Sequence, residues 1–288
     1  MKTNIFLTII LSLFISSCST DKSSMTTEKQ PENYIILLDL SDRLLNSGQA
    51  EQDIELIYHI FEKYESTVRN NLIINSKDKF RIVIAPQEKM NINQSQSESQ
   101  FYLDMSKINI AEKRSELEKF KKDLKNNLNN LYAKVMQNKT KTSDFQGADI
   151  WKYFNDYLSG DIEKDNKNRL FILSDGYFDF EPAYGKKNVG HRSSGSSFLN
   201  LVRGKANWQE LINNNDYGII PINKQFNSIS VCLMEIYPKY ANLDEADMLQ
   251  FVWKRWLGEM NIKESNFIPH TSIPKTEGQI DNYLSNNK

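Results

Sequence analysis

The stretch Tyr34-Ile-Ile-Leu-Leu-Asp-Leu-Ser-Asp-Arg43 decides the fold. Its apolar and aromatic residues run without a break until the chain turns polar at Asp39. An apolar run this short is typical of a strand that is buried on both faces inside a parallel sheet. The polar residues then lie at the carboxyl end of the strand, the edge where open α/β sheets bind ligands. Asp39 and Ser41 offer hard oxygen ligands suited to Mg²⁺, although a plain polar turn would show the same residues.

Strand-like and helix-like patterns alternate along the rest of the chain. Apolar runs predict strands over residues 34–38, 80–85, 101–103, 169–173 and 229–237. Apolar residues spaced by three or four predict helices over residues 54–68, 110–136, 150–158, 206–212 and 244–260. Polar composition predicts loops over residues 91–100 and 182–197. The alternation predicts an α/β fold with a doubly wound, mostly parallel sheet flanked by helices.

Length and composition limit the class of protein. The chain has 288 residues, of which 39% are hydrophobic, and its formal net charge is −1. One large domain can be built from such a chain, and no basic excess points to nucleic acid. Besides Cys18 the only cysteine is Cys232, inside an apolar run, which predicts a buried thiol rather than a disulfide.

The amino-terminal segment has the features of an export signal. Lys2 is followed by an apolar run over residues 5–15, too short to span a bilayer. The next residues, Ile15-Ser-Ser-Cys18, resemble a bacterial lipobox, which implies cleavage before Cys18 and lipid on its thiol. An ordinary secretory signal with an incidental cysteine is the alternative. We therefore expect a signal peptide over 1–17, a lipidated Cys18 with a flexible tether over 18–32, an α/β domain over 33–270 and a polar tail over 271–288. The lipid would anchor the protein in a membrane of the bacterial cell envelope, inner or outer.

Three polar loops supply a candidate metal site: residues 39–43, 142–144 and 174–176. Their order resembles the von Willebrand factor A family, whose adhesion site combines an Asp-x-Ser-x-Ser loop, a threonine and a later aspartate. On this resemblance Asp39 and Ser41 match the first loop, Thr142 matches the threonine with Ser143 as a substitute, and Asp175 matches the last aspartate. The resemblance implies Mg²⁺ or Mn²⁺ with an open position for a carboxylate of an unidentified protein partner. The expected function is therefore protein–protein binding, not catalysis.

Arg43 departs from the family pattern, because it stands where the second serine is expected. A guanidinium cannot bind a metal, since it is itself a cation. Arg43 either points outward while Asp42 or water completes the coordination, or folds inward and neutralises Asp39 and Asp175, so that no metal is needed.

A phosphatase is the alternative function. Asp39 could be the nucleophile of a Mg²⁺-dependent enzyme resembling the haloacid dehalogenases, with Asp175 and Asp179 as metal ligands. That family places an acidic general acid two residues after the nucleophile, where this chain has Ser41, a poor acid at neutral pH. The aromatic residues 177, 178 and 180 beside the third loop either form a lip for a partner or close the core.

Overall fold

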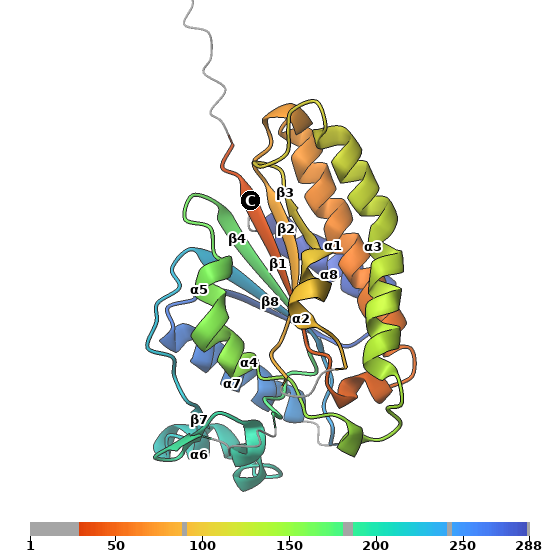
Figure 1. Cartoon of the computed structure of the whole chain (residues 1–288). Helices are drawn as coiled ribbons and strands as arrows, with labels where there is room; N and C mark the ends of the chain where they lie inside the picture. Colours follow the sequence, from red (N-terminus) through yellow and green to blue (C-terminus); the bar gives the residue numbers. More distant parts are fainter. Residues whose placement is uncertain (1–28, 88–90, 181–186, 241–243, 287–288) are drawn as a thin grey trace, which may run out of the picture.

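The computed structural model describes residues 29–87, 91–180, 187–240 and 244–286. Its centre is a six-stranded sheet in the order β3-β2-β1-β4-β8-β9, and only β3 runs antiparallel to its neighbour (Figure 1). The strands are β1 (Glu32–Leu38), β2 (Lys79–Ile84), β3 (Tyr102–Asp104), β4 (Lys167–Leu173), β8 (Ile229–Ile236) and β9 (Glu264–Pro269). The predicted α/β fold with a mostly parallel sheet is confirmed.

Helices cover both faces of this sheet. One face carries α1 (Gln49–Asn70), α3 (Lys113–Met136) and α8 (Ile273–Asn286). The other carries α7 (Glu245–Glu259) and a continuous helical segment made of α4 (Ile150–Lys152), a π-helical turn (Tyr153–Tyr157) and α5 (Leu158–Asp161). Side chains of β1 point alternately into the two cores, with Tyr34 and Ile36 on one side and Ile35 and Leu37 on the other. Both faces are buried, which explains why the run shows no polar alternation.

The carboxyl-terminal part differs from the sequence-based expectation. The expected polar tail over 271–288 contains α8, whose Ile280, Tyr283 and Leu284 are buried against the core beside α1. Tyr283 and Leu284 lie three and four residues after Ile280, so the three side chains lie on one face of the helix. The polar segment therefore contained the pattern of a short amphipathic helix. Strand β9 was also missed, because its sequence Glu264-Ser-Asn-Phe-Ile-Pro269 has few apolar residues.

Two predicted loops contain secondary structure. The segment 91–100 includes α2 (Gln94–Ser99), which begins where the Asn93 side chain accepts a hydrogen bond from the Gln96 amide. The segment 182–197 lies partly outside the described residues, and its described part pairs β5 (Asn188–Val189) with β6 (Arg192–Ser193). Strand β6 also pairs with β7 (Gly218–Ile219), and α6 (Trp208–Asn214) lies beside this small sheet.

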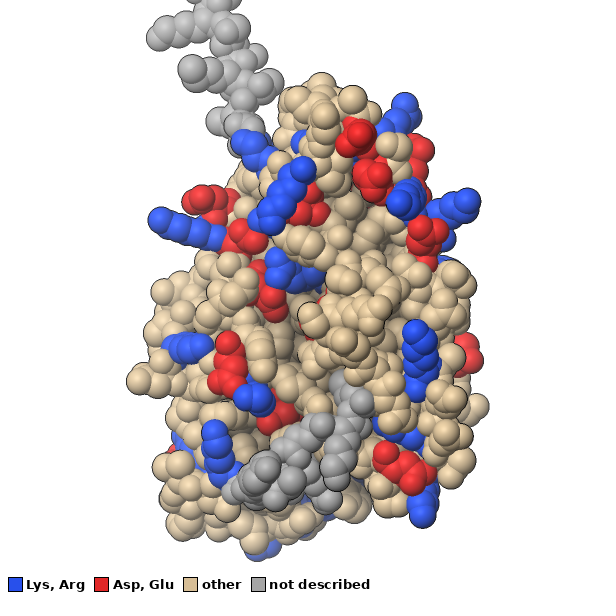
Figure 2. Space-filling view, viewed as in Figure 1, with Lys and Arg blue, Asp and Glu red and all other residues tan. Residues whose placement is uncertain are grey.

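The two ends of the described chain lie together at the amino end of the parallel strands (Figure 1). Lys29 and Ser285 line the same surface hollow beside Glu32, where β1 begins. The signal peptide and Cys18 lie outside the described residues. On the face shown in Figure 2, acidic and basic side chains are intermingled. None of the described helices is long and apolar enough to cross a membrane.

Candidate functional site

The site lies where the order of the strands reverses. Strands β1 and β4 are neighbours, and the chain adds further strands outward from each of them. Loops at such a switch point diverge and leave a crevice at the carboxyl ends of the strands. The Asp39 amide donates a hydrogen bond to the Leu173 carbonyl at 3.0 Å, and the Ser174 hydroxyl donates to Asp39 Oδ2 at 2.7 Å. The loops that carry Asp39 and Asp175 are therefore side by side, as the sequence predicts.

Asp39 is buried and both of its carboxylate oxygens accept hydrogen bonds. Oδ1 accepts from the Ser41 amide at 3.0 Å, and Oδ2 accepts from Ser174. Burial raises the pKa of Asp39, whereas Arg43 and these hydrogen bonds oppose that rise. The carboxylate acts as a structural acceptor that joins two loops. This environment lends no support to a nucleophilic role for Asp39.

Arg43 takes the inward one of the two arrangements expected from the sequence, but its ion-pair partner is a different carboxylate. It folds inward, but its guanidinium pairs with Asp53 of α1, at 2.7 Å from NH1 to Oδ2 and 2.9 Å from NH2 to Oδ1. The Tyr132 hydroxyl donates to the same carboxylate at 2.8 Å, and NH1 also donates to the Asp39 carbonyl oxygen at 3.2 Å. The charge of Arg43 still opposes the rise in the pKa of Asp39 and Asp175, but its direct ion pair is with Asp53, and the expectation is corrected to that extent. The ion pair with Asp53 is fully buried, with side-chain exposures of 1% and 0%.

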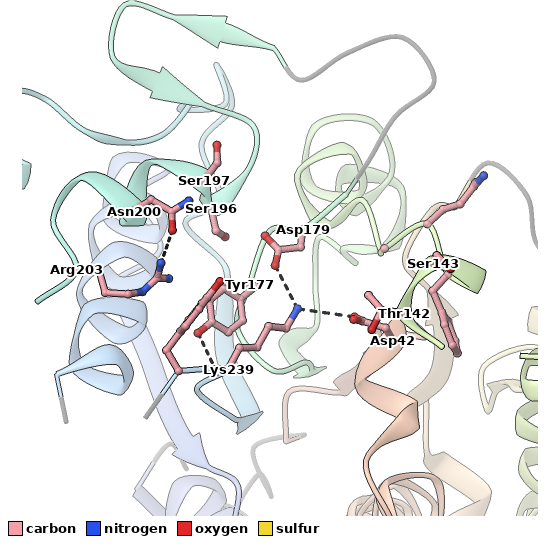
Figure 3. Close-up of a pocket in the computed structure, with 14 residues that line it drawn as sticks. Asp42, Thr142, Ser143, Tyr177, Asp179, Ser196, Ser197, Asn200, Arg203 and Lys239 are labelled. Atoms are coloured by element: carbon pink, nitrogen blue, oxygen red, sulfur yellow. Dashed lines mark hydrogen bonds and ion pairs between the residues drawn. The ribbon is translucent and has the colours of Figure 1, made fainter. Parts of the chain in front are cut away.

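Lys239 supplies the positive charge that Arg43 does not. Its Nζ lies 3.2 Å from Asp179 Oδ2 and 3.7 Å from Asp42 Oδ1 (Figure 3). It also lies 3.3 Å from Oδ2 of the buried Asp175. Burial alone would lower the pKa of Lys239, but the three carboxylates outweigh it and the pKa is raised. Burial raises the pKa of Asp175 to about 7; Lys239 opposes that rise and Asp39 adds to it.

Sequence reasoning missed Lys239, which follows the last residue of β8 by three positions. A charged residue just after the carboxyl end of a buried strand was the available signal. This lysine did not stand out because the motifs of metal sites consist of oxygen ligands and contain no cation.

The residues in this arrangement do not fit a divalent metal ion. A Mg²⁺ or Mn²⁺ ion bound to Asp175 would have to share that carboxylate with the Lys239 ammonium. Arg43 also removes one hydroxyl ligand that the resemblance calls for. Over the described ranges, no group of three or more His, Cys, Asp or Glu residues is arranged to hold a metal.

A polar cavity of about 660 Å³ opens at this edge of the sheet. One wall is the 3-10 turn Thr142–Asp144, which contributes Thr142 and Ser143. The 3-10 turn Ser196–Leu201 contributes Ser196, Ser197 and Asn200 from across the cavity (Figure 3). Asp42, Asp179 and Lys239 lie between them. We call this space the carboxyl-edge cavity.

The predicted site residues are thus divided between two positions. Asp42, Thr142 and Ser143 line the carboxyl-edge cavity. Asp39, Ser41 and Asp175 are buried, with exposures of 2%, 6% and 4%, and do not line it. Asp175 is connected to the cavity through its ion pair with Lys239 and through the hydrogen bond that it accepts from the Tyr177 amide at 3.1 Å.

A partly buried ion pair, between Arg203 and Glu245, supports the cavity from the side of α7. The Arg203 guanidinium donates to both oxygens of Glu245, at 2.8 Å and 2.7 Å, and lies 3.8 Å from the ring centre of Tyr240. The Tyr177 hydroxyl donates to Glu245 at 2.8 Å and accepts from the Lys239 amide at 3.0 Å. Glu245 therefore compensates the charge of Arg203, and Tyr177 fixes the backbone that carries Lys239.

The aromatic residues after Asp175 have separate places. Tyr177 lines the cavity, whereas Phe178 packs against Trp253 in the core with ring centres 4.6 Å apart. Residues 177, 178 and 180 were expected either to form a lip for a partner or to close the core. Among them, Tyr177 lines the cavity and Phe178 closes the core.

Gly147 allows two loops that line the cavity to approach each other closely. Its φ is +75°, and a Cβ added there would lie 1.8 Å from the Asp179 carbonyl oxygen. Only glycine allows this conformation together with so close an approach. The loop of Thr142 and the loop of Asp179 are consequently held in direct contact.

Comparison with known proteins found no family model and no curated protein that matches the chain. The fold and the site define an α/β protein with a polar cavity at the switch point of its sheet. At the cavity, the carboxylates of Asp42, Asp175 and Asp179 surround the partly exposed Lys239 ammonium.

Proposed function

We propose that this chain is a lipid-anchored protein of the bacterial cell envelope that binds a partner protein in the carboxyl-edge cavity without a metal ion. The observation that carries the proposal is the Lys239 ammonium, which lies among Asp42, Asp175 and Asp179. A covalently tethered cation compensates these carboxylates and keeps the adjoining loops together, which a metal would otherwise do.

The proposal includes a domain similar to von Willebrand factor A domains. In its support, the loops of Asp39 and Asp175 are adjacent at the switch point, and Thr142 lines the cavity next to them. The replacement of the family's second serine by Arg43 is consistent with a site that has lost its metal, because Arg43 is committed to Asp53.

The position of the cavity suits a membrane-anchored binding protein. The chain enters the domain at the amino end of β1, and the cavity lies at the carboxyl ends of the strands (Figure 1). A lipid on Cys18 would therefore place the cavity at the end of the domain that faces away from the membrane. This orientation leaves the cavity open to another envelope component.

In-cell photo-crosslinking tests the proposal. A photoreactive residue is placed at Ser143 or Ser197, both exposed at the cavity, and at exposed Glu118 on α3 as the control. We expect a discrete crosslinked protein from the two cavity positions and none from position 118. Equal crosslinking from all three positions, or none from the cavity, would overturn the proposal. Replacing Cys18 by Ser should release the protein from the membrane fraction.

A further inference from the structure

We infer that the group which enters the carboxyl-edge cavity is a basic side chain, lysine or arginine, of the partner protein. The inference rests on the proposed function, because it names the chemistry bound in the same cavity. It reverses the polarity expected from the sequence, where a metal would have attracted a carboxylate.

The net charge of the side chains that line the cavity is the first argument for a cation. Lys239 is the counter-ion of Asp42 and Asp179, which both line the cavity. Even without the buried Asp175, two carboxylates share one ammonium, which leaves a net charge of −1. Arg203 adds no free positive charge, since Glu245 holds its guanidinium with two hydrogen bonds. A carboxylate entering here would be repelled, and a cation would be attracted.

Asp42 and Asp179 have carboxylate oxygens free to accept hydrogen bonds, which is the second argument. Asp42 lies 3.7 Å from Lys239, beyond hydrogen-bond distance, and accepts no hydrogen bond from the described part of the chain. Asp179 accepts one hydrogen bond from Lys239, through Oδ2 at 3.2 Å, and its side chain is 44% exposed. Both carboxylates therefore keep acceptor capacity for an incoming donor.

An unpartnered acceptor gives independent support. Gln146 lines the cavity, and its Oε1 is buried without a hydrogen-bond donor among the residues that the structure describes. A buried acceptor without a donor is unfavourable, and N–H groups of a ligand would satisfy it. A guanidinium or ammonium offers such donors, whereas a carboxylate offers none.

The aromatic rings of the cavity argue against a stacked sugar. Lys239 lies 4.9 Å from the ring centre of Tyr177, and Arg203 lies 3.8 Å from that of Tyr240. Each of these two rings therefore already makes a cation–π contact with a cation of the chain itself. The polar groups, not the rings, are left to select the ligand.

Titration of the isotope-labelled protein by NMR tests the inference. The probes are two end-blocked peptides, Gly-Gly-Arg-Gly-Gly and Gly-Gly-Asp-Gly-Gly. We expect the arginine peptide to shift the amide signals of residues 142–147 and 177–179, and to do so less as salt rises. Asp42→Asn and Asp179→Asn should each weaken its binding about threefold, because partly exposed ion pairs are modest. Glu118→Gln, a matched loss of one exposed carboxylate far from the cavity, should leave binding unchanged.

The outcomes separate the inference from the proposed function. If the aspartate peptide shifts the cavity signals and the arginine peptide does not, the inference is overturned while the cavity remains a binding site. If neither peptide shifts them but crosslinking at Ser143 and Ser197 succeeds, the inference again falls alone. Failure of both experiments overturns the proposed function as well.

Discussion

Replacing Arg43 by Met should be among the most damaging changes outside the apolar core. The variant removes the guanidinium but leaves Asp53 fully buried, with Tyr132 and Gln49 as its remaining donors among the described residues. Removal of one partner from a buried ion pair costs about 3–5 kcal/mol. For a domain of this size, that loss corresponds to a melting temperature lower by about 6–20 °C.

A double variant isolates the cause. Arg43→Met with Asp53→Leu removes both charges, and Gln49 keeps Glu235 as an acceptor at 3.2 Å. The Tyr132 hydroxyl then loses its acceptor and the Asp39 carbonyl loses the donor of Arg43, as it also does in the single variant. We therefore expect a loss of about 1–3 kcal/mol, less than for the single variant. Urea denaturation followed by circular dichroism measures both. Arg69→Met is the control, because its ion pair with Glu65 is partly exposed and should cost less than about 1 kcal/mol. If Arg43→Met is no worse than Arg69→Met, the buried pair does not hold the loop and the reasoning is refuted.

Three further changes test the loops around the cavity. Gly147→Ala should destabilise the protein by about 2 kcal/mol or more in a thermal melt, because Gly147 has a positive φ and lies close to the Asp179 carbonyl. The control Gly160→Ala lies in α5 with open space around it and should be neutral or slightly stabilising. Tyr177→Phe should cost about 1–2 kcal/mol, since Glu245 loses a donor in a buried position; no loss would show that this hydroxyl is dispensable. Burial raises the pKa of Asp175 to about 7, so between about pH 4 and 7 the native state binds more protons than the unfolded state. The free energy of unfolding should therefore fall as the pH rises through this range. Denaturant titrations at several pH values should show a flatter pH dependence for Asp175→Asn.

The sequence was sufficient for five of the six strands of the central sheet, all but β9, and for the meeting of two of its polar loops. The unbroken run of β1 and the similar run of β4 identified two central strands, and their carboxyl ends placed Asp39 beside Asp175. Both inferences depend on local patterns and on the rule that parallel strands end at one edge.

The charge partners in the site could not be predicted from the sequence. Arg43 and Asp53 are ten residues apart, on either side of a turn, and nothing local distinguishes Asp53 from Asp175 as the partner. Lys239 approaches the same loops from beyond β8, so its contact with Asp175 depends on the packing of the whole sheet. Helix α8 was missed for a local reason, since its three buried hydrophobic residues are too few to stand out in a polar segment.

The most direct measurement is the melting temperature of the purified protein in EDTA and in millimolar Mg²⁺ or Mn²⁺, for the wild type and for Lys239→Ala. A metal that binds only the folded state raises the melting temperature by mass action. We predict that the wild type melts at the same temperature in all three solutions. Lys239→Ala should melt lower in EDTA and recover with metal, because its carboxylates are no longer compensated. A wild type that is stabilised by metal, with the effect lost in Asp39→Ala, would contradict the assignment of Lys239 as the cation of this site.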